Sequence, residues 1–511
     1  MPELGNRRWW ALFALVPAVL AVGLDVTVLS VALPTLAGTL HAGTGDLQWF
    51  VVGYSLMFAA AMVPGGMLGD RIGRKRTLLG ALAVFGLGSV ACALSTTSGE
   101  LIAARVLLGL GAAVVVPMAM GVLPVLFTET ERPKALAAIM TATMLGYPVG
   151  PILGGWLLDN TWWGWVFLMN VPVVLIGLVS VALLVPESRS SQPRRFDVPG
   201  IVTSSTGLAA LTYGVIEAGD RGWGDATALG WIVAGLALLT GFVLLQRRNA
   251  EPLVDLGLFA SRGFSWGTAL ATGVSFAMFG LMFAMPQYFQ AVLRTNAEGS
   301  GLRLVPLVVG LLIGAPLADR AARRIGDGPA IGLGLLIMAG SLAAGASTGT
   351  STGTAFTAGW ILLSGLGMGL SLPTAMDAAL AALPKERSGV GSAVIQALRM
   401  VGGSVGAAVL GSVLNGGYHA RLQLDGVPAA VVGAVRDGVT SGVAVADRLG
   451  SAPLRADVVS AYLHGMSLML ATSAGLAAVC AGLAVAFMPR HRGSAEGGGD
   501  DEEPASARMA T

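Results

Sequence analysis

The segments GGMLGDRIGRK, at residues 65–75, and GAPLADRAARR, at residues 314–324, decide the fold of this 511-residue chain. Aligned without gaps, they share a Gly, a Leu, an Asp and two Arg residues, and each closes an apolar run. A motif that returns 249 residues later indicates an internal repeat, so the chain is expected to contain two related bundles of helices.

The composition indicates that these bundles lie in a membrane. Hydrophobic residues make up 54% of the chain and charged residues 12%, whereas a soluble domain carries about 25% charged residues. With so few charges, a chain of this length could not cover its surface with water-compatible side chains. The composition therefore excludes a soluble enzyme, a disordered protein and a nucleic-acid-binding protein.

Fourteen apolar runs are long enough to cross a bilayer, which takes about 20 residues. The repeated segments close the second and tenth runs, so runs 1–6 and 9–14 are expected to form the two bundles, with runs 7 and 8 inserted between them. The runs lie at 10–34, 47–69, 77–96, 100–123, 135–158, 163–185, 198–217, 227–246, 264–289, 302–318, 329–347, 354–380, 389–414 and 463–488.

These runs divide the chain into four expected parts. Residues 1–186 form an N-terminal six-helix bundle, 187–262 two linker helices, and 263–489 a C-terminal six-helix bundle with a long outer segment at 415–462. The last part, 490–511, contains three consecutive glycines followed by four acidic residues, a composition typical of a disordered tail.

Basic residues in the loops predict the orientation, because Lys and Arg accumulate in cytoplasmic loops. With the N-terminus inside, 22 of the 31 Lys and Arg residues fall in cytoplasmic segments and 7 in outer segments. Both termini are therefore expected in the cytoplasm.

Asp25 and Arg105 are charged residues within the first and fourth runs. An intramembrane carboxylate is costly and is functional by default. At 1.5 Å per residue, Asp25 lies roughly 13 Å and Arg105 about 7 Å below the outer ends of their helices, so the two can pair directly or through water. A carboxylate balanced between burial and a nearby cation can take up and release a proton. The alternatives are a carboxylate that never titrates and a static buried ion pair.

A second buried pair is expected in the C-terminal half. Asp377 lies roughly 12 Å and Arg399 roughly 16 Å from the cytoplasmic ends of their helices. The expected use of this pair is a structural clasp.

The run GYPVGPILGG at residues 146–155 combines glycines with prolines. Gly146, Gly150 and Gly154 are spaced by four, which forms a flat face for another helix. Pro148 and Pro151 each remove a backbone donor and bend the helix. Generic small-residue packing explains the glycines but not the added prolines.

Four segments together make the chain resemble the fourteen-spanning drug:proton antiporter branch of the major facilitator superfamily. The resemblance covers the whole chain except the tail, and it departs from the family at Leu108, where a Gln is common. The segments are residues 24–27 with 32–34, residues 66–76, Arg105 with Gly109 and Gly111, and residues 146–155, with residues 163–172 as a further family-like stretch.

The resemblance implies an all-α polytopic membrane protein with the major facilitator fold, in a bacterial plasma membrane. It implies a secondary transporter, not an enzyme, that exports lipophilic drugs or antibiotics in exchange for protons, without a cofactor or a metal. The expected partners are the small lipophilic substrate, protons and the lipid bilayer, with no nucleic acid and no obligate protein partner.

The resemblance also implies roles for individual residues. Asp25 and Arg105 would carry the proton, and the run at 146–155 would be the antiporter motif, with Gly155 as its last residue. The expected cytoplasmic latch between the bundles comprises Gly66, Asp70, Arg71, Gly73, Arg74 and, with a weaker match, Asp319. Positive-inside anchoring explains the basic residues of this loop but not the aspartate that is present in both repeats.

Three alternatives stay open at this point, one of which is a sensor or channel, although it would not need two bundles with a repeated latch. A dedicated exporter of one self-made antibiotic or metabolite fits the same residues. A nutrient importer of the same fold is also possible, although it would give no reason for the run at 146–155.

Overall fold

The computed structural model describes residues 7–128, 131–189, 197–249, 252–384, 388–424 and 427–488, and these residues contain helices and no strand. In chain order the helices are α1 (Arg7–Thr39), α2 (Thr44–Ile72), α3 (Arg74–Leu94), α4 (Ser98–Leu126), α5 (Arg132–Asn160), α6 (Trp165–Leu168), α7 (Asn170–Leu184), α8 (Val198–Arg221), α9 (Ala226–Arg248), η1 (Leu256–Ala260), α10 (Arg262–Gln287), η2 (Tyr288–Val292), α11 (Ala297–Arg303), α12 (Val305–Ile325), α13 (Asp327–Gly345), α14 (Thr354–Ala381), α15 (Ser388–Arg421), α16 (Ala429–Arg436), α17 (Val439–Arg448) and α18 (Ala452–Phe487).

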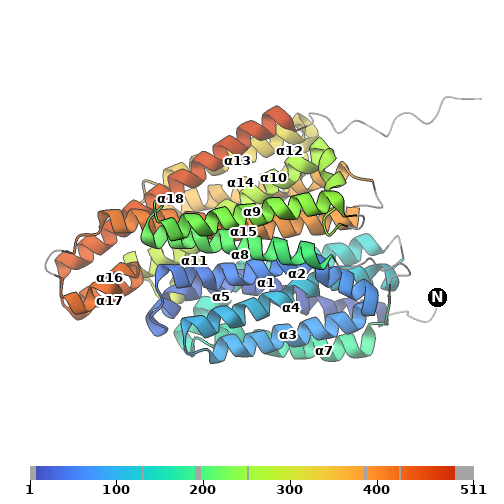
Figure 1. Ribbon diagram of the computed structural model, residues 1–511, viewed down its shortest axis with the longest axis horizontal. Helices are drawn as coiled ribbons and strands as arrows, with labels where there is room; N and C mark the ends of the chain where they lie inside the picture. The colour runs from blue at the N-terminus through green and yellow to red at the C-terminus, as the bar shows by residue number, and fades with distance from the viewer. Residues whose placement is uncertain are drawn as a thin grey trace, which may run out of the picture.

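The long helices form two groups (Figure 1). Helices α1–α7 lie together in one group and α10–α18 in the other, while α8 and α9 pack on each other and α8 lies along α2 and α15. Helix α1 begins and α18 ends at the same end of the molecule (Figure 1). The architecture confirms the expected all-α polytopic fold.

Twelve of the described helical segments are long and apolar enough to cross a membrane. The other two expected runs, at 135–158 and 198–217, lie in α5 and α8, which are helices of 29 and 24 residues but fall outside this set. Each expected run therefore falls on a helix. The sixth run is broken at Met169, which separates α6 from α7.

The repeat seen in the sequence pairs the same residue types in both halves. Asp70 of α2 pairs with Arg74, the first residue of α3, whereas Asp319 pairs with Arg323 within α12. The glycines that end these helices differ, however. Gly73 ends α2 with φ +117° and Gly326 ends α12 with φ +87°, so the second turn lies about one helical turn later than the alignment predicts.

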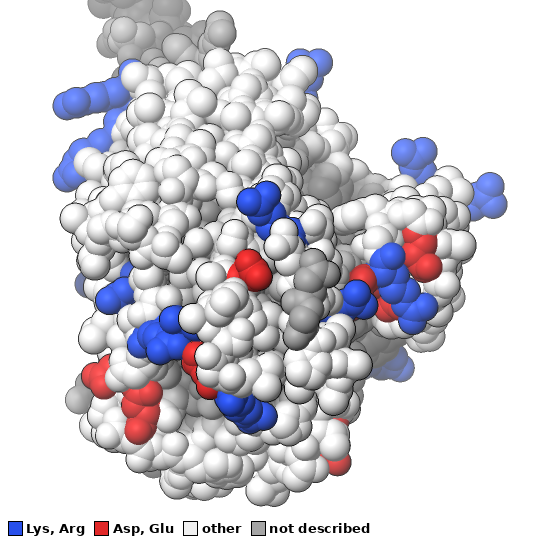
Figure 2. Space-filling view, turned by 90° about the vertical axis from the view of Figure 1, so that its left-hand side faces the viewer, with Lys and Arg blue, Asp and Glu red and all other residues white. Residues whose placement is uncertain are grey.

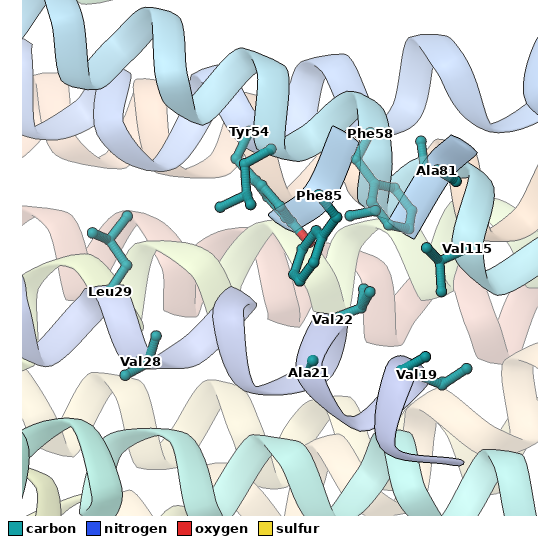
Figure 3. Packing of buried hydrophobic residues seen from close by; sticks show 14 of the residues in the cluster. Val19, Ala21, Val22, Val28, Leu29, Tyr54, Phe58, Ala81, Phe85 and Val115 are labelled. Carbon is teal, nitrogen blue, oxygen red and sulfur yellow. The ribbon is translucent and has the colours of Figure 1, made fainter. Parts of the chain in front are cut away.

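Helix α1 is enclosed by the other helices of its half. Figure 3 shows Val19, Val22 and other α1 side chains beside side chains from α2, α3 and α4, including Phe85 and Val115, and all of these belong to one buried cluster. Helices in a membrane associate through close packing. Small residues at the helix contacts therefore determine how closely two helices can approach.

The outer segment at 415–462 is not a simple solvated hairpin. Helix α15 continues to Arg421 and α18 begins at Ala452, and the short helices α16 and α17 lie between them at the left end of the molecule (Figure 1). The Tyr418 hydroxyl donates to the Val435 carbonyl oxygen at 2.6 Å, and Val435 is fully buried. The segment is therefore packed into the buried cluster of the C-terminal half, which contains Val435, Val439 and Val443.

The contact between α8 and α9 gives a test of this architecture. A methyl group at Gly235 of α9 would overlap the backbone of Leu211 in α8, whereas a methyl group at Gly230 of the same helix would meet no atom within 4 Å. We expect Gly235→Ala to lower the free energy of unfolding by roughly 1–3 kcal/mol through overpacking. Gly230→Ala is the matched control and should leave the melting temperature in detergent unchanged or slightly higher. Equal effects of both substitutions would contradict the observed packing.

Candidate functional site

Asp25 and Arg105 form an ion pair inside the N-terminal half. Arg105 Nη1 donates to Asp25 Oδ2 at 2.7 Å, and the two residues are 0% and 1% exposed. The direct pair that the helix depths allowed is therefore present. Because both charges are shielded from water, each depends on the other, and removing one partner of such a pair costs about 3–5 kcal/mol.

Helix α2 provides further contacts for the Arg105 guanidinium. Arg105 Nε donates to the Phe50 carbonyl oxygen at 2.9 Å. The guanidinium carbon lies 4.5 Å from the centre of the Tyr54 ring, in a cation–π arrangement. Phe50 and Tyr54 are one turn apart on α2, so a single face of this helix holds the cation.

Two glycines on α4 allow neighbouring helices to approach closely around Arg105: Gly109 faces α2 and Gly111 faces α3. A methyl group at Gly109 would overlap the Tyr54 carbonyl oxygen, and one at Gly111 would lie 2.5 Å from the Phe85 backbone nitrogen on α3. Gly109 lies one turn after Arg105, so the close approach of α4 to α2 occurs where the guanidinium is held. Both glycines are therefore explained by helix packing around the ion pair.

The glycine stripe of the run at 146–155 faces α1 at the turn that carries Asp25. A methyl group at Gly146 would lie 2.8 Å from the Gly23 carbonyl carbon. One at Gly150 would overlap the Thr27 hydroxyl, and one at Gly154 would overlap Val28. The flat face that the spacing predicts is present, and it fixes the backbone of α1 around the carboxylate.

The remaining members of this run have other surroundings. Gly155 faces the other half of the chain, since a methyl group there would lie 2.6 Å from the Ala297 carbonyl oxygen of α11. The Pro151 carbonyl oxygen lies where a side chain on Gly301 of α11 would be. Pro148 belongs to α5, but its side chain lies outside the described residues.

Hydrogen bonds join the two halves at the end that carries α16 and α17. The Asp159 carboxylate of α5 accepts from the backbone nitrogens of Ala297 and Glu298 at 3.1 and 2.9 Å. Gln290 Nε2 donates to the Val31 carbonyl oxygen at 2.9 Å, and Gln48 Nε2 to the Ala408 carbonyl oxygen at 3.0 Å.

A further contact at this end ties α2 to the outer segment. The backbone nitrogen and the hydroxyl of Thr44 both donate to the Asp437 carbonyl oxygen, at 2.9 and 2.8 Å. Burial and the nearby Asp46 raise the pKa of the Asp437 carboxyl group, against the opposing effect of His419. Figure 2 shows this end of the molecule, where charged side chains of both signs are scattered over an otherwise uncharged surface.

The residues of the expected latch lie at the opposite ends of α2 and α12. The Arg74 guanidinium bonds Asp70 at 2.9 Å and the Gly121 carbonyl oxygen of α4 at 2.6 Å, so it joins three elements of one half. Gly73 lies against Glu187, and Gly66 has open space where a side chain would be. Arg71 and Asp319 are exposed. The bridging of the two halves by these residues stays a prediction.

The expected Asp377–Arg399 pair has a different setting. Arg399 is buried, and its guanidinium donates to the Gln396 side-chain oxygen at 2.8 Å and to the Ser275 hydroxyl at 3.2 Å. Asp377, in contrast, is exposed and lines a hollow on α14 together with Asp319 and Asp327. The pairing of Asp377 with Arg399 stays a prediction.

A small cavity of about 20 Å³ lies between the two halves. None of the residues lining it is charged, and its polar groups are hydroxyls. The Thr27 hydroxyl lies 3.3 Å from the Leu24 carbonyl oxygen, and the Ser30 hydroxyl donates to the Thr27 carbonyl oxygen at 2.7 Å. The lining residues are Val26, Thr27, Leu29 and Ser30 of α1, Val51 of α2, and Met278, Phe279, Met282 and Phe283 of α10.

Of the cavity lining, the sequence offered only Met278 and Met282 as candidates, and it missed the other residues. Met278 and Met282 are four residues apart, and methionines at this spacing in an apolar helix more often belong to the packed core. The sequence placed each of these residues in an apolar helix. It did not show which face of that helix lies against the site.

The fold and the site define a multi-pass membrane transporter, with two groups of helices, a cavity between them and a buried charge pair beside it. The sequence matches the Major Facilitator Superfamily over residues 15–407, and the chain belongs to this family. It is therefore a transporter of small molecules and not an enzyme.

Similar proteins include antibiotic and multidrug resistance transporters. The chain is 34% identical to the "Tetracenomycin C resistance and export protein" of Streptomyces glaucescens, over 80% of this chain and 77% of that protein. It is also 34% identical to the "Multidrug efflux pump LfrA" of Mycolicibacterium smegmatis, over 88% and 89% of the two chains.

Solved structures share the fold at low sequence identity. A bacterial homologue of the human lysosomal transporter Spinster has a TM-score of 0.68 at 16% identity, covering 95% of this chain and 98% of that one. A D-xylose–proton symporter has a TM-score of 0.59 at 15% identity, with coverage of 94% and 98%. These similarities confirm the major facilitator fold.

The packing of α4 against α2 gives a test of how the cation is held. We expect Gly109→Ala to displace α2 from Arg105, to lower the free energy of unfolding by roughly 1–3 kcal/mol, and to reduce transport. Gly99→Ala, in the first turn of the same helix, adds a methyl group where nothing lies within 4 Å and serves as the control. Thermal unfolding in detergent and transport in vesicles measure both effects. Wild-type behaviour of Gly109→Ala would contradict the close contact.

Proposed function

We propose that the chain is a proton-coupled antiporter that exports lipophilic drugs or antibiotics across the bacterial plasma membrane. One observation carries this proposal: α1 holds Asp25, which is paired with Arg105, and the same helix lines the cavity between the halves with Val26, Thr27, Leu29 and Ser30. A single helix thus connects a buried carboxylate with the cavity where we place the substrate.

The cavity supports a lipophilic substrate of low charge. Its walls are aliphatic, aromatic and thioether groups, and methionine adapts to irregular shapes. An uncharged lining offers no counter-ion for a dication, whereas Thr27 and Ser30 can each hydrogen-bond a neutral oxygen or nitrogen. Neutral and monocationic compounds therefore fit this site better than dications.

Coupling would run through the position of α1. Protonation of Asp25 removes the charge that holds Arg105, so the pair loosens and the contacts of α1 with α2 and α4 change. The cavity-lining residues of the same helix then present a different cavity wall to the substrate. In this cycle Asp25 takes a proton from outside as the substrate leaves, and it releases the proton inside before the next substrate binds.

The inter-half contacts support alternating access. Asp159, Gln290, Gln48 and Thr44 join the halves at the end that carries α16 and α17, and we assign this end to the outside from the distribution of basic residues. These contacts would have to break when the cavity opens outward. In that state Asp70, Arg71 and Arg74 at the other end would join the halves. Helix α1 begins and α18 ends at this other end, which we assign to the cytoplasm.

The helices α8 and α9 are proposed as an inserted pair that links the two six-helix bundles. Asp197 at the start of α8 accepts from Gln246 Nε2 near the end of α9 at 2.5 Å, and the Ser412 hydroxyl of α15 donates to the Val215 carbonyl oxygen of α8 at 2.8 Å. The pair is thereby attached to the C-terminal bundle. It would move with that bundle when the halves rearrange.

A second candidate function is export of one self-made antibiotic. Two of the similar proteins are named after a single compound. They are the "Tetracenomycin C resistance and export protein" and the "Probable actinorhodin transporter" of Streptomyces coelicolor. The cavity fits this function as well as broad efflux, and a panel of substrates separates the two. A response to one compound class indicates the dedicated exporter.

Proton movement in energised inverted vesicles tests the proposed function. We expect lipophilic antibiotics and dyes to trigger proton release from wild-type vesicles, and Asp25→Asn to abolish the release, because the amide cannot carry the proton. Asp447→Asn is the control, since its carboxylate pairs with Arg294 on the surface, where such a pair contributes little. Release that persists in Asp25→Asn would place the proton on another residue. A wild-type protein that exports drug without any proton release would refute antiport.

Substitution of Met282 tests the cavity. Met282→Ala removes part of the cavity wall, so we expect the KM for bound substrates to rise several-fold while the protons released per substrate stay constant. Met67→Ala, on a half-buried position of α2 away from the cavity, is the matched control and should keep wild-type KM values. Equal KM changes in both variants would remove the cavity as the substrate site.

A further inference from the structure

Tyr54 of α2 lies against the cation of the buried ion pair. Its ring centre is 4.5 Å from the guanidinium carbon of Arg105, and the two residues are 2% and 1% exposed. A cation over an aromatic ring is attracted by the electron-rich face, and this attraction is strongest where water is absent. The Phe167 ring of α6 is farther from the guanidinium carbon, at 6.0 Å. Tyr54 therefore provides the closer of two aromatic contacts to the cation.

The guanidinium uses different groups for its contacts with α1 and with α2. Nη1 donates to Asp25 Oδ2 at 2.7 Å, whereas Nε donates to the Phe50 carbonyl oxygen at 2.9 Å and Cζ lies over the Tyr54 ring. A proton on Asp25 removes the negative charge on the α1 side and leaves the groups of α2 unchanged. The cation then depends on the Phe50 carbonyl oxygen and the Tyr54 ring.

Helix packing keeps Tyr54 and Arg105 in register. A methyl group at Gly109, one turn after Arg105, would overlap the Tyr54 carbonyl oxygen, so α4 and α2 are in close contact at this level. The carboxylate belongs to a different pair of helices, because the glycine stripe of α5 lies against α1, with Gly150 at Thr27. The ion pair thus joins two closely packed pairs, α1 with α5 and α2 with α4.

A ring suits this position better than a second carboxylate. A second carboxylate would neutralise Arg105 permanently, and Asp25 would lose the cation that favours its ionised form. The ring has no net charge, so the guanidinium still attracts Asp25. The ring stabilises the cation most when Asp25 is neutral, because its electron-rich face acts with opposite sign on a carboxylate beside the cation.

The other titratable side chains near the pair are neutral. They are the phenol of Tyr54 and the buried thiol of Cys92 on α3. Both groups are uncharged near pH 7, so a shift in the pH dependence of proton release reports on Asp25.

We propose that Tyr54 is a positioning residue of the proton site, whose ring holds the Arg105 guanidinium on α2 while Asp25 is protonated. The ring thereby stabilises the protonated state relative to the ion pair, and α1 can move while the cation stays on α2. This inference rests on the proposed function, because it requires that Asp25 gains and loses a proton during transport.

The test is the pH profile of substrate-driven proton release by the purified full-length protein in liposomes. Tyr54→Leu removes the ring, so the protonated state loses more stabilisation than the ion pair does. We expect the midpoint of the profile to move to lower pH by about half to one unit. Tyr54→Phe keeps the ring and should have the wild-type midpoint. A midpoint that is unchanged or higher in Tyr54→Leu, or an equal shift in Tyr54→Phe, would overturn the inference.

Fluorination separates the electrons of the ring from its size. Tyr54→Phe with one, two or three fluorine atoms on the ring keeps the shape of the side chain and weakens the electron-rich face step by step. We expect the midpoint to fall with each added fluorine atom. This series provides the measurement if Tyr54→Leu does not fold. Equal midpoints across the series would reduce Tyr54 to a packing residue and overturn the inference.

A matched control and a second readout complete the test. Phe264→Leu removes a fully buried ring from α10, where it contacts the Phe259 ring, and it should keep the wild-type midpoint. An equal shift in Phe264→Leu would attribute the effect to lost packing and overturn the inference.

Infrared difference spectra follow protonation without transport. The carbonyl band of protonated Asp25, identified by its loss in Asp25→Asn, should titrate at lower pH in Tyr54→Leu and at the wild-type pH in Tyr54→Phe. A band that titrates at the same pH in all variants would overturn the inference, even if Asp25→Asn abolishes proton release. Proton release that survives Asp25→Asn would instead refute the proposed function.

Discussion

The buried ion pair between Asp25 and Arg105 is the constraint on which the site depends. Two opposite charges without water are stable together and costly apart, so the helices that carry them must hold both in register. The Phe50 carbonyl oxygen and the Tyr54 ring complete the surroundings of the cation. Any proton that neutralises Asp25 changes the balance among these contacts, and the pair is therefore suited to convert a protonation into a movement.

Helix packing makes this arrangement possible. Gly109 lets α4 approach the backbone of α2, and the stripe of Gly146, Gly150 and Gly154 lets α5 lie against α1 around Asp25. Lipid tails are as apolar as the helices, so close contact between helices must come from shape and polar bonds, not from the exclusion of water. The same small residues thus stabilise the N-terminal half and position its charges.

The two halves of the chain share a sequence motif, but their buried arginines have different hydrogen-bond partners. Asp70–Arg74 and Asp319–Arg323 are matching pairs of the repeat. In the N-terminal half the buried Arg105 is paired with Asp25, and in the C-terminal half the buried Arg399 donates to Gln396 and Ser275. The C-terminal half contributes Met278, Phe279, Met282 and Phe283 to the cavity, and its role is in contacting the substrate.

The sequence by itself determined the class of fold, the approximate helices and the candidate charges, because long apolar runs must cross the membrane as helices and a charge inside one stands out. It also identified the glycine stripe, since a spacing of four residues defines one helix face. Tertiary structure alone decided what these faces meet: α1 for Gly150, α11 for Gly155, and the cavity for Met282. It also placed Ser275 of α10 beside the Arg399 guanidinium. Such contacts join residues far apart along the chain, and no local pattern encodes the distance between them.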